Sequence, residues 1–268
     1  MYVLRSFGAL LALTLTLSLP AQPYSLDWNR EAWIGGAGLA VMAADLGLNH
    51  SMRPLTESQI AQLNDRTIPW LDRVAVYRFS PAAGLRSDIA QWSAFTMTGV
   101  VAGGLLLRSW RQDDHPAFFR EGFVLATLLI ETNLLALDGT YLLKGSVRRP
   151  RPYVFNPDVP PERKRSAEDR RSFFSGHTSL AAANSFFAAT VFSDYFPESK
   201  WKPLVWGLAI GIPAWTGVER CLAGKHFPTD VLSGYAFGAF CGWLVPRLHR
   251  GPGRLQVYPA PFRVELDF

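Results

Sequence analysis

The sequence is poor in cysteine, which excludes a fold built on disulfide bonds. Only Cys221 and Cys241 occur in 268 residues, and both lie in or beside apolar segments, where a thiol packs as a small apolar side chain. Internal repeats and basic stretches interleaved with aromatic residues are also missing, although the net charge is +5. We therefore expect neither a repeat architecture nor a protein that binds nucleic acid.

Charged residues are sparse within six apolar segments that are spaced along the chain. Residues Ile89–Leu107 carry no charge, and their length is close to the ~20 residues that a membrane-spanning helix needs. The other five segments are Ala32–Leu48, Gly122–Leu143, Gly176–Phe192, Leu204–Val218 and Val231–Pro246. Several are short or contain an acidic residue, but their spacing and small residues favour a membrane bundle over a soluble core. We expect an all-α, polytopic bundle of about six transmembrane helices.

The first 22 residues resemble a secretory signal peptide. Arg5 precedes an apolar run from Phe7 to Leu19, which Pro20 and Ala21 follow. Leu19 is large for its position before a cut after Ala21, so an uncleaved anchor helix is the alternative. We expect a signal peptide or anchor at 1–22, a membrane domain at 23–250 and a C-terminal tail at 251–268.

Polar residues gather at the ends of apolar segments in three stretches: "KGSVRRPRP" (Lys144–Pro152), "FSGH" (Phe174–His177) and "ERCLAGKHFPTD" (Glu219–Asp230). The first follows the third apolar segment, the second precedes the fourth, and the third lies between the fifth and sixth. If successive helices cross the membrane in alternating directions, all three stretches emerge on the same side. We therefore expect a single site at one membrane face.

The residue types in these stretches suit a phosphate group. Lys144, Arg151 and Arg220 are cations, and the planar guanidinium of arginine matches phosphate oxygens. Ser175 adds a hydroxyl, and Gly176 allows backbone N–H groups at a helix N-terminus to approach an anion. Such a pocket stabilises the negative charge of a phosphoryl transition state, with cationic side chains in the electrostatic role of a metal. We expect no metal and no cofactor.

Two of the five histidines belong to the pattern. His226 and Asp230 are four residues apart, a spacing at which the carboxylate can orient the imidazole and stabilise its protonated form. His226 is then the candidate nucleophile, which forms a phosphohistidine, and His177 the candidate general acid for the leaving oxygen. Taken singly, the basic loop is more often topogenic and a His/Asp pair more often structural; the three stretches together favour catalysis.

In these motifs the sequence resembles the type-2 phosphatidic acid phosphatase superfamily, in its membrane-bound lipid phosphatase branch. The family pattern is Lys, six residues, Arg-Pro; then Pro-Ser-Gly-His; then Ser-Arg, five residues, His, three residues, Asp. The matching positions are Lys144, Arg151, Pro152, Ser175, Gly176, His177, Arg220, His226 and Asp230. The resemblance implies the same roles for His177 and His226. Phe174 and Glu219 depart from the family's proline and serine, which puts pocket detail and substrate choice in doubt rather than the reaction.

The resemblance implies a metal-independent phosphatase that acts on a membrane lipid phosphate. Candidate substrates are phosphatidic acid, phosphatidylglycerophosphate, an isoprenyl pyrophosphate and a lipid A-type glycolipid phosphate. The alternatives are a lipid phosphotransferase, a secreted acid phosphatase of the same superfamily and a lipid-binding protein without activity. Further basic residues could contact a lipid headgroup or only face solvent: Arg148, Arg149, Arg163, Lys164 and Arg165.

The resemblance implies a multi-pass protein of the bacterial inner membrane with its site on the periplasmic face. If the N-terminal segment is translocated, six further spans place the site on the cytoplasmic face instead. Nine of the 27 basic residues lie between Lys144 and Arg171, and such an excess of basic residues is typical of a cytoplasmic loop. Catalytic arginines contribute to that count. The sequence therefore favours a periplasmic site on family grounds alone and leaves the oligomeric state open.

Overall fold

A computed structural model describes residues 23–112 and 115–251. The proposed signal peptide or anchor at 1–22 and all of the tail after Gly251 lie outside the described residues. The long helices are α2 (Trp28–His50), α4 (Pro81–Arg111), α5 (His115–Val147), α7 (Gly176–Tyr195), α8 (Lys202–Leu222) and α9 (Pro228–Leu248). Each contains one of the six apolar segments, so the all-α prediction is confirmed for the part of the chain that the structure describes.

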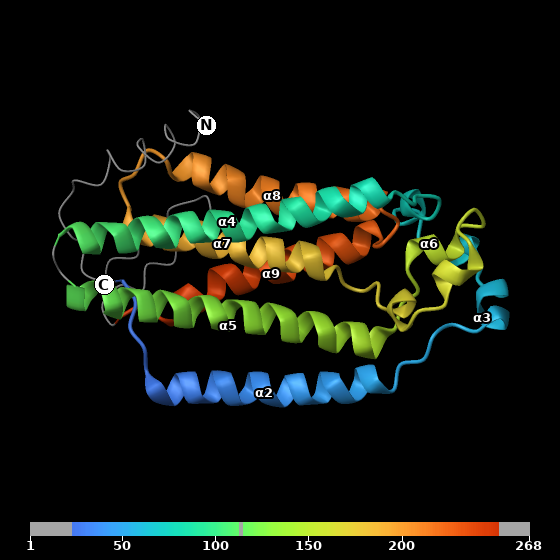
Figure 1. Cartoon of the computed structure of the whole chain (residues 1–268), viewed down its shortest axis with the longest axis horizontal. Helices are drawn as coiled ribbons and strands as arrows, with labels where there is room; N and C mark the ends of the chain where they lie inside the picture. Colours follow the sequence, from blue (N-terminus) through green and yellow to red (C-terminus); the bar gives the residue numbers. More distant parts are fainter. Residues whose placement is uncertain (1–22, 113–114, 252–268) are drawn as a thin grey trace.

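Short elements connect the long helices at one end of the bundle, on the right in Figure 1. They are α3 (Glu57–Ala61), α6 (Pro152–Phe155) and four short 3-10 helices at Asp65–Thr67, Arg73–Ala75, Pro161–Lys164 and Ala167–Arg170. Thr56 caps α3 with its hydroxyl, as a threonine before a helix commonly does.

Helix α7 forms the centre of the bundle and packs against α4, α5, α8 and α9. Its residues Ala181–Ala183, Ala188 and Ala189 are fully buried, because small side chains let several helices approach at once. A ridge of glycines on α9 faces α7: a Cβ atom on Gly238 would lie 2.0 Å from the Ser179 carbonyl oxygen. Helix α2 lies at the edge of the bundle beside α5 (Figure 1).

The outside of the bundle is apolar, as expected of helices in a bilayer. Large exposed hydrophobic side chains occur on the five long helices other than α7, including Trp33, Trp92, Ile130, Ile210 and Leu232. Two segments, Pro81–Arg111 and His115–Phe155, are long and apolar enough to cross a membrane by length and composition. The structure is therefore a helical membrane bundle, while six spans remain a prediction.

Candidate active site

The three polar stretches meet at the end of the bundle that carries the short elements. Backbone hydrogen bonds join them: Ser175 N–H donates to the Asp230 carbonyl at 3.0 Å, and Tyr153 N–H donates to the Gly224 carbonyl at 3.0 Å. Ser172, just before the second stretch, donates its N–H to Arg149 of the first. These bonds bring residues up to 71 positions apart to one site.

The cationic side chains come from three elements. Lys144 lies in the last turns of α5, Arg151 directly precedes α6, and Arg220 lies in the last turn of α8. All three side chains are buried. Arg151 is held by the Glu168 backbone carbonyl at 2.7 Å and by its carboxylate at 3.0 Å. Buried cations without full neutralisation attract an anion, so this geometry suits a phosphate group.

His226 lies just before α9 and presents one free ring nitrogen. Its Nδ1 donates to the Ser172 carbonyl at 2.7 Å, since a carbonyl can only accept. Nε2 therefore carries the lone pair, and it has no hydrogen-bond partner among the described residues. Burial lowers the pKa of His226 well below its ordinary value, and Arg220, Arg151 and Lys144 lower it further. The ring is thus neutral near pH 7, the form that a nucleophile requires.

Asp230 has partners other than the imidazole. Its Oδ2 lies 3.9 Å from Nδ1 of His226, beyond hydrogen-bond distance. That oxygen accepts from the Phe227 N–H at 2.9 Å and from the Ser172 hydroxyl at 2.5 Å, and Oδ1 accepts from Arg149 at 2.5 Å. The expected direct contact with His226 is thus replaced by the Ser172 carbonyl. Asp230 instead bonds to the segments on either side of the imidazole, through the Ser172 hydroxyl and the Phe227 N–H.

His177 lies in the first turn of α7, and an acidic residue that the motifs do not include is its partner. Its Nε2 is 3.0 Å from Oδ1 of Asp88 on α4. The same carboxylate oxygen is 3.9 Å from Arg220. The His177 side chain is 37% exposed, whereas that of His226 is 1% exposed. This difference suits a histidine that exchanges protons with a leaving group or with water.

Ser175 and Gly176 form the N-terminus of α7. The Ser175 hydroxyl caps the helix and lies 2.9 Å from the Thr178 hydroxyl. A Cβ atom on Gly176 would lie 3.5 Å from Nζ of Lys144. A glycine therefore leaves room where the helix N-terminus and the lysine face the same space, and both attract anions there.

The two positions that depart from the family pattern have structural partners. Phe174 packs against Phe237 of α9, with ring centroids 5.3 Å apart. Glu219 pairs with Arg86 of α4 at 2.8 Å, rather than with its neighbour Arg220.

Most of the extra basic residues are engaged with protein groups. Arg148 donates to Ser51, Arg149 to Asp72 and Asp230, and Lys164 to the Asn156 carbonyl. Arg165 pairs with Glu57. Arg163 instead lines a cavity beside the site. These contacts favour structural roles for four of the five residues.

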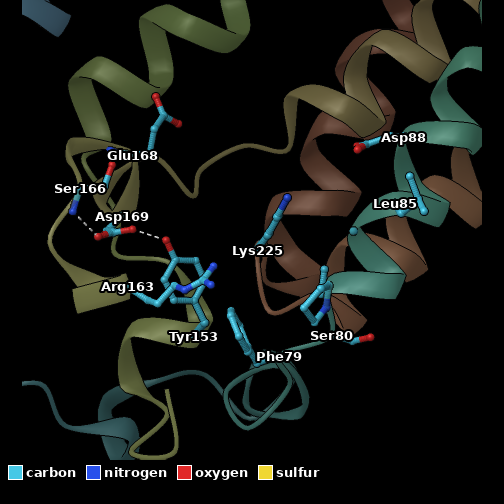
Figure 2. Close-up of a pocket in the computed structure, with 13 residues that line it drawn as sticks. Phe79, Ser80, Leu85, Asp88, Tyr153, Arg163, Ser166, Glu168, Asp169 and Lys225 are labelled. Carbon is cyan, nitrogen blue, oxygen red and sulfur yellow. Dashed lines mark hydrogen bonds between the residues drawn. The ribbon is translucent and has the colours of Figure 1, made fainter. Parts of the chain in front are cut away.

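That cavity has a volume of about 500 Å³ and opens between α4 and the connection after α6. Figure 2 shows Ser80, Leu85 and Asp88 of the α4 side facing Tyr153, Arg163 and Glu168, with Lys225 between them. Burial lowers the pKa of Lys225, and Arg220 lowers it further. Since Asp88 also contacts His177, the cavity adjoins the candidate general acid.

Sequence reasoning did not identify three residues at the site, Asp88, Ser172 and Lys225, and it named Arg149 only as one of the extra basic residues. Asp88 had a detectable signal, because it is an acidic residue directly before the uncharged stretch at 89–107. Lys225 and Arg149 lie inside the motif spacings, where the pattern specifies no residue type. Ser172 contributes a backbone carbonyl, which no side-chain pattern reveals.

Comparison with known proteins places the chain in a family. Residues 122–254 match the model of the PAP2 superfamily. A lipid A 1-phosphatase of Rhizobium etli is 36% identical over 53% of this chain and 55% of its own length. A probable diacylglycerol pyrophosphate phosphatase of Schizosaccharomyces pombe is 30% identical over 40% of this chain and 46% of its own. The chain thus matches about half the length of these relatives.

A solved structure is also similar, the transmembrane PAP2-type phosphatidylglycerolphosphate phosphatase of Bacillus subtilis. It is 25% identical to this chain, with a TM-score of 0.43, and the match covers 78% of this chain and 93% of that one. The family match contains all three motifs between Lys144 and Asp230. The chain therefore belongs to the PAP2 superfamily.

Proposed function

We propose that this protein is a metal-independent lipid phosphate phosphatase that works through a phosphohistidine on His226. The observation that carries the proposal is Nε2 of His226, which has no hydrogen-bond partner among the described residues. The charges of Arg220, Arg151 and Lys144 act on this imidazole and contribute to its lowered pKa. A neutral imidazole beside buried cations is arranged to attack a bound phosphate. Each role below is part of this proposal.

In the first step, the Nε2 lone pair of His226 attacks phosphorus, and the bond from phosphorus to the lipid oxygen breaks. His177 gives its proton to that oxygen, and the lipid alcohol leaves. Water then attacks phosphorus and His177 accepts a proton from the water. The bond from phosphorus to Nε2 of His226 breaks, which releases inorganic phosphate and restores the lone pair of Nε2. The cations and the N-terminus of α7 at Gly176, with Ser175, stabilise the equatorial oxygens in both steps.

The imidazole needs a fixed orientation for this attack. The Ser172 carbonyl holds Nδ1–H, so the attacking nitrogen is always Nε2. Asp88 plays the corresponding part for His177, because its carboxylate lies 3.0 Å from Nε2 and can hold the ring in one orientation. Asp230 positions His226 through Ser172 and through the start of α9.

The substrate class is a membrane lipid with a terminal phosphate or pyrophosphate. The cavity of about 500 Å³ next to Asp88 offers both carboxylates and amines, a lining that suits a headgroup rich in hydroxyls. Two curated relatives bear the name lipid A 1-phosphatase. A glycolipid 1-phosphate is therefore the first substrate to test, ahead of diacylglycerol pyrophosphate, phosphatidic acid and isoprenyl pyrophosphate.

Phosphate release from this panel of lipids by the purified full chain tests the proposal. We expect His226→Ala to abolish release and a matched change at the exposed His50, His50→Ala, to leave it intact. An unchanged rate in His226→Ala would indicate a lipid-binding protein instead. Labelled phosphate that appears in a lipid product rather than as free phosphate would indicate a phosphotransferase, and activity that a chelator abolishes would contradict the metal-free mechanism.

We place the protein in the bacterial inner membrane with the site on the periplasmic face. An exposed residue of the 161–164 helix, Glu162, is suitable for a cysteine label at that face. We expect an impermeant thiol reagent to label Glu162→Cys in intact inner-membrane spheroplasts, and the unchanged chain controls for Cys221 and Cys241. Labelling only after permeabilisation would place the site in the cytoplasm.

A further inference from the structure

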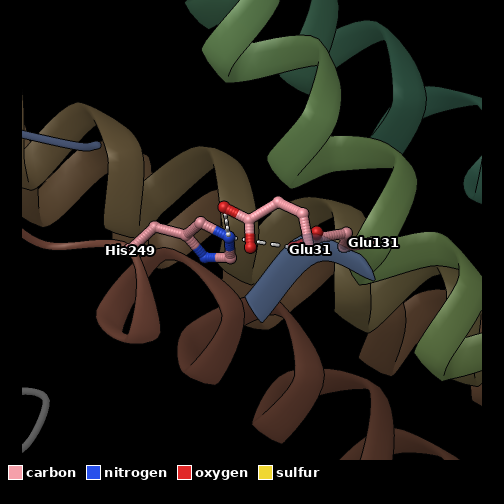
Figure 3. A group of neighbouring side chains, drawn as sticks. All are labelled: Glu31, Glu131 and His249. Carbon is pink, nitrogen blue, oxygen red and sulfur yellow. Dashed lines mark ion pairs between the residues drawn. The ribbon is translucent and has the colours of Figure 1, made fainter. Parts of the chain in front are cut away.

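A second cluster of titratable side chains lies far from the catalytic motifs. Glu31 from the first turn of α2, Glu131 from the middle of α5 and His249 at the end of α9 meet there (Figure 3). At a rise of about 1.5 Å per residue, His249 lies about 28 Å along α9 from Asp230. By the same measure Glu131 lies about 20 Å along α5 from Lys144. The phosphatase site does not use this cluster.

The histidine of the cluster points a lone pair at the carboxylates. His249 is fully buried, and its Nδ1 donates to the Val245 carbonyl at 2.8 Å. Nε2 is 3.0 Å from Oε2 of Glu131 and 3.6 Å from Oε1 of Glu31. Neither Nε2 nor Oε2 of Glu131 has a hydrogen bond within the described part of the chain. Three electron-pair donors thus converge in a buried space.

The charges of the cluster do not balance with a neutral histidine. Arg30 binds both oxygens of Glu31 at 3.0 Å, and the Asp27 N–H adds a bond of 2.8 Å to Oε1. Among the described residues, the carboxylate of Glu131, which is 6% exposed, then has only His249 as an ion-pair partner, and a neutral imidazole does not compensate its charge. A buried charge without a partner is costly, so a positive species between Glu131 and His249 stabilises the fold.

We propose that Glu31, Glu131 and His249 bind a divalent metal ion of the zinc class. Imidazole nitrogen and carboxylate oxygen are the donors such ions take, and a ligand histidine commonly donates its other N–H to a backbone carbonyl, as His249 does to Val245. Donors about 2.1 Å from a tetrahedral zinc lie about 3.4 Å from one another. The separations of 3.0 and 3.6 Å from Nε2 bracket that value.

A proton on Nε2 is the competing source of positive charge, and the geometry disfavours it. An N–H group has to point at its acceptor, yet the contact of 3.0 Å between Nε2 and Glu131 does not meet hydrogen-bond geometry. A metal ion lies off the line that joins its two donors, so this contact suits shared coordination. Water would complete the fourth position.

The ion would fasten the two ends of the described chain together. Ser25 N–H already donates to the His249 carbonyl at 2.8 Å, and Arg30 donates to the Leu248 carbonyl at 2.5 Å. Among the described helices, α5 is the only one against which α2 packs extensively. The site is therefore structural: it holds α2 on the bundle and takes no part in phosphate release.

The test uses the full chain purified in detergent from zinc-supplemented cells and dialysed against metal-free buffer. We expect about one zinc per chain by elemental mass spectrometry in the unchanged protein and in the control His50→Gln. We expect Glu131→Gln and His249→Gln to lose it. Adding zinc to the chelated, unchanged protein should raise Tm by about 5 °C and leave the phosphate-release rate of the folded enzyme unchanged.

A second readout does not depend on the folding of any variant. Cobalt added to the chelated, unchanged chain should give the visible absorption of a tetrahedral site, and zinc should displace it. An absence of bound metal, of cobalt absorption and of a Tm shift in the unchanged chain would overturn the proposal and leave a protonated ion-pair cluster. Because the readouts are metal content and Tm, their outcome is independent of the proposed phosphatase activity.

Discussion

Replacing Asp230 with asparagine tests which group orients His226, the proposed nucleophile. In a triad whose aspartate fixes the histidine tautomer, this change lowers kcat by about 10⁴. Here the Ser172 carbonyl binds Nδ1 of His226 at 2.7 Å, while Asp230 is 3.9 Å away. The tautomer should therefore survive, and only the position of the imidazole should change. A displacement of about 1 Å costs about 10²-fold in rate, so we expect a fall of that size.

The same variant should also lose stability. Asp230 is fully buried and accepts hydrogen bonds from Arg149, Ser172 and the Phe227 N–H. An amide has one acceptor oxygen in place of two, so at least one charge-assisted bond is lost, at about 1.5–3 kcal/mol of the free energy of unfolding.

The assay for both effects compares phosphate release with a thermal melt in the same detergent. His226→Ala defines the floor of the activity, and kcat is measured well below the Tm of each variant. A loss in Asp230→Asn as large as that in His226→Ala, with an intact melt, would refute the role assigned to the Ser172 carbonyl.

Three further outcomes are expected. His177→Ala should lower kcat by about 10²–10⁴-fold, and Asp88→Asn should lower it by about tenfold. The double variant should have the kcat of His177→Ala, because Asp88 is expected to act through that imidazole. Additive losses in the double variant would show that Asp88 acts independently of His177. Because the pKa of His226 is lowered in the folded chain, the unfolded chain takes up a proton at this histidine that the folded chain does not. The free energy of unfolding should therefore fall as pH drops below about 6.5, the ordinary pKa of histidine, toward the lowered pKa of the folded state. In Tm measurements across this pH range, His226→Gln should show a smaller fall. Glu219→Ser should leave kcat and Tm nearly unchanged, since its partner Arg86 is exposed; a large loss of activity would show that the Arg86 pair positions Arg220.

Patterns in the sequence predicted the long helices because each has an apolar core segment with polar ends. Helix α4 is an example: an uncharged stretch at 89–107 lies within Pro81–Arg111. The ends were less predictable, because Ser80 and Pro81 begin α4 eight residues before the apolar stretch. Capping by a hydroxyl and a proline at the first turn explains that early start.

The spacing of His226 and Asp230 illustrates why contacts within the site were harder to predict. A separation of four residues places two side chains together only if both belong to one helix. Helix α9 begins at Pro228, so His226 precedes it, and the carboxylate of Asp230 turns back to the Phe227 N–H. The partner of the imidazole is then set by tertiary packing of the Ser172 segment.

Asp88 shows a second limit of the sequence. It lies 89 positions before His177, and only the packing of α4 on α7 brings the two together. The motifs indicate His177 as the candidate general acid, but not the carboxylate that accompanies it. Such pairings depend on which faces of distant helices meet, which one sequence does not specify.

The glycine ridge of α9 has a meaning for catalysis as well as for packing. The proposed acid lies in the first turn of α7 and the proposed nucleophile lies just before α9, so the gap between the two imidazoles depends on how closely those helices approach. A methyl group on Gly234 would come within 2.6 Å of the Ser175 carbonyl, and one on Gly238 within 2.0 Å of that of Ser179. Glycines that carry no reactive group thereby set the distance between the two histidines of the proposed proton and phosphoryl transfer.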